Sequence, residues 1–173
     1  GERFGIIALS PSSIRRQQRM VRVMGVDSRY AGSWSVGASA AETAGADIRG
    51  RLIEAGRALV TQCRADVVVM NVLPRAATKL GIDVKTLRAI KPDLIYVSIT
   101  GFGMEGERAD WACYDLIAEG YSGVMDLTGE IANDPQKVGT PAADMLAGQD
   151  AALATLAALC ARARDGKGRV IDI

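Results

Sequence analysis

The chain of 173 residues contains no histidine, and this absence excludes more chemistry than any other feature of its composition. Nucleophiles activated by an imidazole base and zinc sites built on imidazole ligands are both unavailable to it. Any catalysis must therefore use a carboxylate, a lysine, a tyrosine, a thiol or the backbone.

Cysteine is scarce, and its spacing shows no pattern. Cys63, Cys113 and Cys160 are an odd number of cysteines without C-x-x-C spacing. We therefore expect neither a disulfide framework nor a thiolate zinc site, and a reducing cytoplasm is the expected setting.

The sequence also lacks a long apolar run, a signal peptide and a strong charge of either sign. These absences predict no membrane span, and a net charge of +1 gives no overall attraction to nucleic acid or membrane. With 49% hydrophobic and 24% charged residues, the composition is that of a globular protein with a core. Because the first residue is Gly1 and the last lies in an expected strand, we expect the chain to belong to something longer.

Apolar runs alternate with helical periodicity through the middle of the chain. Residues 67–70 (VVVM) and 94–99 (LIYVSI) predict two buried parallel strands, and residues 83–90 predict a helix in the crossover between them. Ligands bind at the carboxyl ends of such strands, which here lead into residues 71–75 (NVLPR) and 100–106 (TGFGMEG). The second loop is rich in glycine but matches no nucleotide-binding motif, and on its own such a loop is more often just a turn.

The first third of the chain has a weaker pattern. Residues 4–9 predict a strand, and residues 10–24 predict a helix that ends at Gly25. Residues 25–45 are rich in Gly, Ser and Ala and predict a linker, and residues 47–63 return to helical periodicity.

The last 37 residues predict a loop, a long helix over residues 142–163, a turn and a strand. Thr140 is expected to be the N-cap, with Pro141 at the first helical position. An apolar stripe at heptad spacing predicts that one face of this helix is buried. The stripe consists of Leu146, Leu153, Leu156, Leu159 and Cys160.

Asp144 falls in the first turn of this helix, where an ionised carboxylate is favoured by the helix dipole. Gly148 follows one turn later and leaves that carboxylate uncovered, since helical side chains lean back over the preceding turn. From the residues alone, two interpretations stay open. Asp144 is either an accessible reactive group or a charge that only complements the dipole, with Gly148 as a packing contact.

The same segment resembles the family III CoA-transferases, a group that includes formyl-CoA and carnitine CoA-transferases and the acyl-CoA racemases. The matching residues are Val138, Gly139, Asp144, Gly148, Arg164, Gly166, Gly168, Ile171, Asp172 and Ile173. The resemblance extends back to about Arg64 through ADVVVMN, LIYVSITGFGMEG, the pair Tyr114 and Asp115, and residues 127–129 (LTG). It covers roughly two thirds of the chain through several ordered motifs.

The resemblance implies an α/β fold with Rossmann-like parallel strand–helix units, as a fragment of an interlocked-dimer CoA-transferase fold. Residues 64–173 are assigned to the family core. Residues 1–63 match poorly and are expected to form a strand–helix segment and a linker, as a junction with a neighbouring module would explain.

The resemblance also implies a site. Asp144 aligns with the nucleophile of the family. The residues expected to contact CoA are Asn71, Val72, Leu73, Lys79, Ala112, Cys113, Tyr114 and Asp115. Lys79 stands where some members have an arginine that pairs with a CoA phosphate, Val72 replaces phenylalanine, and Cys113 replaces glycine.

The implied function is transfer of CoA between carboxylic acids through an aspartyl anhydride and an aspartyl-CoA thioester, in a homodimer and without a metal. Racemases have a histidine where Tyr114 stands, so a racemase is disfavoured. The alternatives are a non-catalytic CoA-binding or dimerisation module on the same fold, and an interaction fragment.

Overall fold

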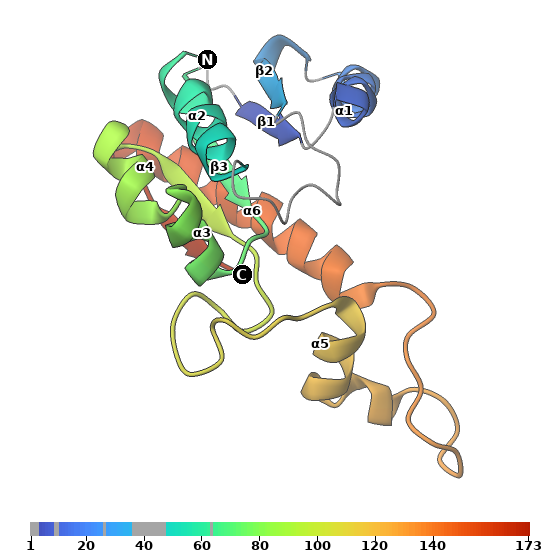
Figure 1. Ribbon diagram of the computed structural model, residues 1–173. Coiled ribbons are helices and arrows are strands. Elements are labelled where there is room, and N and C mark those ends of the chain that lie inside the picture. The colour runs from blue at the N-terminus through green and yellow to red at the C-terminus, as the bar shows by residue number, and fades with distance from the viewer. Residues whose placement is uncertain (1–3, 9–10, 26, 36–47, 63) are drawn as a thin grey trace.

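The computed structural model describes residues 4–8, 11–25, 27–35, 48–62 and 64–173 (Figure 1). The described strands form one parallel sheet in the order β2-β1-β3-β4-β5. Their bounds are β1 (Phe4–Ala8), β2 (Tyr30–Ser35), β3 (Val67–Met70), β4 (Ile95–Ser98) and β5 (Val170–Asp172). The strands predicted at residues 4–9, 67–70 and 94–99, and the strand at the end of the chain, are all present.

Helices cover both faces of this sheet. They are α1 (Pro11–Val23), α2 (Ile48–Thr61), α3 (Pro74–Leu80), α4 (Val84–Ile90), α5 (Asp115–Ser122) and α6 (Ala142–Asp165), with short 3₁₀ helices η1 (Asp27–Arg29) and η3 (Val124–Leu127). Helices α2, α3 and α4 lie on one face and α6 on the other, while α5 and its flanking loops extend beyond the sheet near the start of α6 (Figure 1). None of the helices in the described ranges has the length and apolar character needed to cross a membrane.

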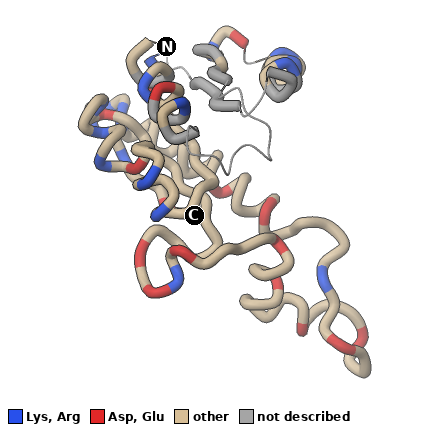
Figure 2. The backbone as a smooth tube through the Cα atoms, viewed as in Figure 1, with Lys and Arg blue, Asp and Glu red and all other residues tan. Residues whose placement is uncertain are grey.

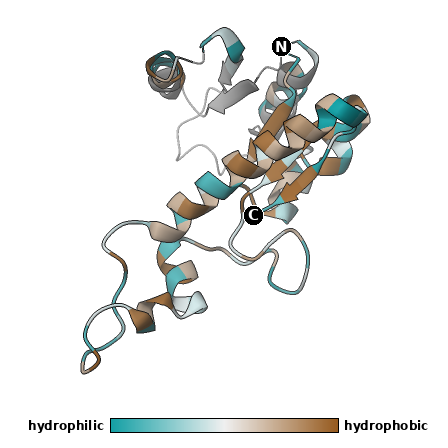
Figure 3. Cartoon of the chain, turned by 180° about the vertical axis from the view of Figure 1, so that it is seen from behind, coloured by the Kyte–Doolittle hydropathy of each residue, from teal (hydrophilic) through white to brown (hydrophobic). Residues whose placement is uncertain are grey.

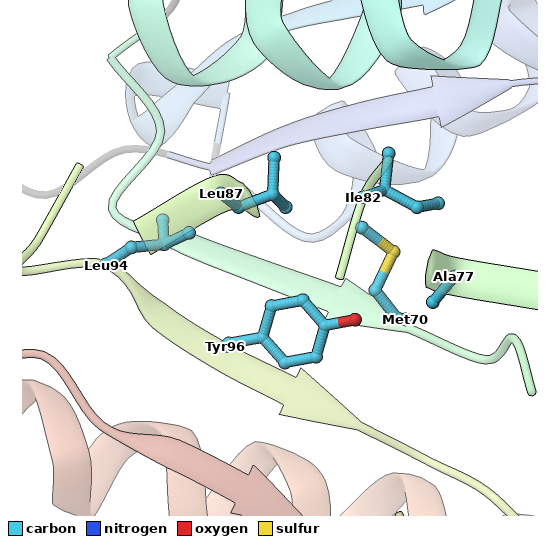
Figure 4. Packing of buried hydrophobic residues seen from close by; sticks show 6 residues of the cluster. All are labelled: Met70, Ala77, Ile82, Leu87, Leu94 and Tyr96. Atoms are coloured by element: carbon cyan, nitrogen blue, oxygen red, sulfur yellow. The ribbon is translucent and has the colours of Figure 1, made fainter. Parts of the chain in front are cut away.

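The core under α3 and α4 is built on the two central strands. Figure 4 shows its buried members, which are Met70, Ala77, Ile82, Leu87, Leu94 and Tyr96. Burial, together with the nearby negative charge of Asp83, raises the pKa of Tyr96 to about 12, so its hydroxyl stays neutral in the core. Strand β4 is buried on both faces. The β-branched run of β3 predicts the same burial, but this prediction is wrong for Val69, which is 57% exposed.

The core under α6 contradicts the predicted leucine stripe. Ala151 and Ala158 of α6 pack against Ile95 and Val97 of β4. Of the predicted stripe, only Leu159 is half-buried and packs against this cluster. The other members are exposed, and they are Leu146, Leu153, Leu156 and Cys160. Figure 3 shows apolar residues along α6 where it crosses the sheet. Periodicity could not select the buried face, because the helix is apolar on both sides and small alanines allow close approach to the strands.

The N-terminal segment joins the same sheet. β1 pairs with β2 in parallel and also meets β3, where Phe4 pairs with Val67. The prediction of a linker over residues 25–45 is therefore wrong where the chain forms β2. The rest of that linker, within residues 36–47, and Cys63 lie outside the residues that the structure describes. Residues with weak strand propensity form β2 because pairing with β1 overrides local preference. The domain boundary at residue 63 stays a prediction.

Helix α3 was not predicted, although the sequence contained a signal for it. Pro74 occupies the start of the helix, where its missing N–H costs nothing, and Gly81 closes it with a φ of 66°. The segment Pro74–Leu80 spans only two turns, which is too short for apolar periodicity to reveal.

The turn between α6 and β5 explains two glycines of the family motif. Gly166 caps α6 in the left-handed conformation, and its N–H bonds the Arg162 carbonyl at 2.8 Å. A Cβ on Gly168 would lie 2.4 Å from the Leu94 carbonyl oxygen and 2.7 Å from the carbonyl carbon of Asp93. Only glycine fits at position 168, because the chain entering β4 passes directly against it.

A buried guanidinium fastens this turn to the sheet. The side chain of Arg162 is 9% exposed, and its Nη2 lies 3.0 Å from Asp66 Oδ1, just before β3. Its Nη1 donates to the Asp93 carbonyl at 3.2 Å. Lys91 joins the network 3.1 Å from the same Asp66 oxygen. Helix α6 is thereby fixed to the amino ends of β3 and β4.

Candidate active site

A pocket of about 240 Å³ lies at the carboxyl ends of β3 and β4. Three segments form it: the chain after β3, the chain after β4 and the chain entering α5. Its lining residues are Asn71, Val72, Leu73, Ile99, Thr100, Gly101, Ala112, Cys113 and Tyr114. Its position agrees with the general location of ligand sites in open parallel sheets.

Hydrogen bonds hold the strand ends together beneath this pocket. The side-chain amide of Asn71 donates to the Ile99 carbonyl at 3.0 Å, and the Ile99 N–H donates to the Met70 carbonyl at 2.8 Å. On the other side, the Thr100 N–H donates to the Ile173 carbonyl at 2.9 Å. The pocket floor is therefore a continuation of the sheet.

The glycine-rich loop after β4 is shaped by contacts within the chain. A Cβ on Gly101 would lie 1.9 Å from the Cβ of Cys113. Because Gly101 has no side chain, the segment before α5 can pass in close contact with this loop. Gly103 has a φ of 82°, and Asp172 Oδ2 accepts the Met104 N–H at 2.8 Å. The sequence identified Asp172 only as a motif residue; the structure shows that it anchors this loop.

Aromatic rings attach the same loop to α5. Phe102 meets both Trp111 and Tyr121 edge to face, with ring centroids 5.7 and 5.3 Å apart. The guanidinium of Arg108 lies 5.3 Å from the ring centroid of Trp111 and 5.0 Å from that of Tyr121. This cluster holds the loop after β4 and helix α5 as one unit.

Asp144 is exposed in the first turn of α6, and its N–H donates to Asp115, the residue after Tyr114 of the pocket lining. Burial raises the pKa of the Cys113 thiol, an amide hydrogen bond from Ala118 lowers it, and the charge of Asp144 raises it further. The carboxylate is therefore close enough to act electrostatically on a pocket-lining side chain. A thiol with a raised pKa is a weak nucleophile at neutral pH, which leaves the carboxylate as the stronger candidate.

The N-terminus of α6 is capped from a distance. The helix begins at Ala142 after Pro141, and no side chain at the cap position accepts a hydrogen bond, so the predicted N-cap role of Thr140 is wrong. Instead, Asp115 Oδ1 accepts the N–H groups of Ala143 at 2.8 Å and Asp144 at 3.2 Å. Sequence reasoning missed this cap because its partners are 28 and 29 residues apart.

The space beside Asp144 is open. Gly148 is exposed, and a Cβ built on it would meet no atom within 4 Å outside the backbone of its own helix. As predicted, no side chain at position 148 covers the Asp144 carboxylate. The role of this open space in catalysis stays a prediction.

The predicted CoA-contacting residues divide into two groups. Asn71, Val72, Leu73, Ala112, Cys113 and Tyr114 all line the pocket. Asp115 lies beside it as the cap of α6, and Lys79 is exposed in the last turn of α3. Figure 2 shows Lys and Arg gathered on α3 and α4, next to the pocket-forming loop after β3. Their contacts with CoA stay predictions.

No group of three or more metal-ligating side chains is present in the described part of the chain. The site offers a pocket, a neighbouring carboxylate at a helix N-terminus and basic side chains on the adjoining helices. These features suit an anionic ligand whose reactive end approaches Asp144.

Comparison with known proteins identifies the family. The sequence pattern described as CoA-transferase family III matches residues 53–173. The chain belongs to CoA-transferase family III. The succinate–glutarate CoA-transferase of Agrobacterium fabrum is 45% identical over 109 residues, which make up 63% of this chain and 27% of that protein.

Two further family members bear on the extent of the chain. The succinyl-CoA:glutarate CoA-transferase of Mus musculus is 39% identical over 107 residues, covering 62% of this chain and 24% of that protein. A solved structure of a CaiB/BaiF family protein from Brucella suis is 28% identical with a TM-score of 0.66, covering 99% of this chain and 52% of that one. The predicted α/β class with a parallel sheet is thus confirmed. The chain spans about a quarter of these curated relatives and half of the solved structure.

Proposed function

We propose that the protein transfers CoA from an acyl-CoA to a carboxylic acid, with Asp144 as the nucleophile. The observation that supports this most strongly is the placement of Asp144 beside a pocket at the carboxyl ends of β3 and β4, in a family III chain. The relatives named for succinate and glutarate make succinyl-CoA and glutarate the first donor and acceptor to test.

The proposed reaction is a sequence of acyl exchanges on one carboxylate. An oxygen of Asp144 attacks the thioester carbonyl, the carbon–sulfur bond breaks, and a mixed anhydride forms with release of CoA thiolate. The thiolate then attacks the aspartyl carbonyl of the anhydride, which frees the donor acid and leaves an aspartyl-CoA thioester. The acceptor carboxylate attacks the carbonyl of this thioester, the carbon–sulfur bond breaks, and a second anhydride forms with release of CoA thiolate. The thiolate then attacks the acceptor carbonyl of this anhydride, which gives the new acyl-CoA and restores the Asp144 carboxylate. Each step exchanges groups of comparable activation, which divides one difficult transfer into easier ones.

Backbone N–H groups of the glycine loop after β4 would stabilise the oxyanion that forms in each attack. The contacts of Gly101 with Cys113 and of Met104 with Asp172 hold that loop in one conformation. A donor group that is already fixed needs no reorganisation when charge develops on the substrate.

For CoA itself, we propose that the six pocket-lining residues named above contact the pantetheine end, and that Lys79 pairs with a phosphate. Lys79 is exposed, so this ion pair would contribute up to about 1 kcal/mol rather than the larger value of a buried pair. We propose the cytoplasm as the setting, with the protein acting as a homodimer.

One observation favours a second candidate, a non-catalytic CoA-binding or dimerisation module. Leu146, Leu153 and Leu156 of α6 are 58%, 68% and 60% exposed, which is a large apolar surface for one helix. Such a face suits assembly with another protein surface whether or not the site is active. A racemase remains disfavoured, because Tyr114 stands where the racemases have histidine.

Two measurements test the proposal. Purified protein incubated with succinyl-CoA and glutarate should form glutaryl-CoA, detected by mass spectrometry. Calorimetry with CoA should show weaker binding to Lys79→Ala than to wild type, while the control Lys167→Ala, an exposed lysine in the turn before β5, should bind as wild type does. CoA binding without transfer would establish the non-catalytic module instead, and no CoA binding would refute both candidates.

A further inference from the structure

Glu119 is the charged residue that the described part of the chain buries most completely, with 2% of its surface exposed. It lies in α5 and does not line the pocket. Burying a carboxylate is unfavourable unless specific contacts compensate, so we expect Glu119 to make a contact that an apolar side chain could not make.

One of its oxygens holds the loop that leads to α6. Glu119 Oε2 accepts the backbone N–H of Val138 at 3.0 Å. Val138 is half-buried and precedes Asp144 by six residues. The other oxygen, Oε1, is buried and has no hydrogen-bond partner among the residues described.

Asp115 stands one turn earlier on the same helix and therefore on the same face as Glu119. It accepts the N–H groups of Ala143 and Asp144 at the other end of the same loop. Two carboxylates from consecutive turns of α5 thus hold the backbone at both ends of residues 138–144.

We propose that Glu119 is a positioning residue, which together with Asp115 fixes the segment 138–144 on α5 and so sets the place of the Asp144 carboxylate beside the pocket. The inference rests on the proposed nucleophilic role of Asp144. Glu119 acts through the backbone and touches no substrate, so its contribution is geometric.

The unpartnered Oε1 makes the proposal specific. Among the residues that the structure describes, only Oε2 of Glu119 has a hydrogen-bond partner, and a glutamine carbonyl accepts the same bond without burying a charge. Glu119→Gln should therefore preserve the position of the loop, whereas Glu119→Leu keeps the side chain's bulk and removes the acceptor. A displacement of about 1 Å at a reacting group can reduce the rate by about 100-fold.

The test compares these two variants with Asp126→Leu, an exposed carboxylate of η3 that serves as control. Hydrogen exchange of the Val138 amide reports the contact independently of turnover. Steady-state kinetics with succinyl-CoA and glutarate report its consequence. In Glu119→Leu, the Val138 amide should exchange about fivefold faster or more. Its kcat should fall about 10- to 100-fold while KM changes little.

Glu119→Gln and Asp126→Leu should retain both the slow exchange and a kcat within about threefold of wild type. The proposal is overturned if Glu119→Leu keeps the slow exchange or the kcat of wild type. It is also overturned if Glu119→Gln loses the slow exchange of the Val138 amide or the kcat of wild type. If Glu119→Leu does not fold, the result for Glu119→Gln alone tests the proposal. If exchange behaves as expected but Asp144→Ala retains turnover, the contact stands and the proposed function fails.

Discussion

Gly168→Ala is the substitution for which the structure gives the sharpest expectation. The added methyl group would lie 2.4 Å from the carbonyl oxygen of Leu94 and 2.7 Å from the carbonyl carbon of Asp93. Both are backbone atoms at the start of β4, so no side-chain rotation can relieve the contact. Either β5 must move away from β4, or the turn after α6 must rearrange.

The cost follows from what must move. Inserting one methyl group into a packed site typically costs about 1–3 kcal/mol, and we expect the upper end because the obstacle is backbone. Movement at Gly168 would also disturb the next residue, Arg169. The Arg169 carbonyl accepts the Tyr96 N–H at 2.8 Å, and this bond begins the pairing of β4 with β5. For a chain of this size, a loss of about 3 kcal/mol lowers Tm by roughly 6–12 °C.

Two other glycines of the same helix and turn provide controls for denaturant and thermal unfolding. Gly166 has a φ of 70° and open space at its Cβ, so Gly166→Ala should cost only the conformational strain of about 1 kcal/mol. Gly148 lies in α6 with open space, so Gly148→Ala should raise the free energy of unfolding by about 0.5–1 kcal/mol. The reasoning is refuted if Gly168→Ala is no more destabilising than Gly166→Ala.

Three further predictions concern the packing and capping of helices. Arg162→Ala should cost about 1.5–3 kcal/mol by urea unfolding, because it removes the charge-assisted hydrogen bonds to Asp66 and Asp93 although Lys91 still pairs with both, whereas exposed Arg164→Ala should change stability by less than about 0.5 kcal/mol. Leu153→Ala should also stay within about 0.5 kcal/mol, since Leu153 is 68% exposed; a larger loss would show that this face is covered in solution. Burial alone would raise the pKa of Asp83, but hydrogen bonds from Thr86 hold it below 3.8. Asp83→Ala should therefore cost about 1 kcal/mol at pH 7. In acid titrations this difference should be complete above pH 3.8 and should vanish as the pH falls through the lower, folded value.

The strands of the central sheet could be predicted because their sequence pattern is local. Residues 67–70 and 94–99 are short β-branched and apolar runs bounded by polar residues, and β3 and β4 fall within them. Local pattern failed for β2, whose Gly, Ser and Ala residues become a strand only through pairing with β1. It failed again for α6, because both sides of that helix are apolar and only the sheet determines which side is buried.

The candidate site divides in the same way. The pocket-lining residues 71–73 and 112–114 were named from the family resemblance, whose matching motifs follow recognisable strands or precede a helix. The contacts that fix Asp144 could not be named, because Asp115 and Glu119 reach it and its loop across 19 to 29 residues. No local periodicity encodes such a contact, and a buried glutamate in α5 resembles any polar helical residue when only the sequence is read.

The most direct test of the central proposal is to trap the acylated carboxylate. The protein is incubated with succinyl-CoA and then with hydroxylamine, which converts an aspartyl anhydride or thioester to a hydroxamate that peptide mass spectrometry locates. We predict the modification on Asp144, its loss together with turnover in Asp144→Ala, and its retention in Asp150→Ala, which alters an exposed carboxylate of the same helix. A hydroxamate on Asp115 or Glu130 instead, or full turnover by Asp144→Ala, would contradict the assignment of Asp144 as the nucleophile.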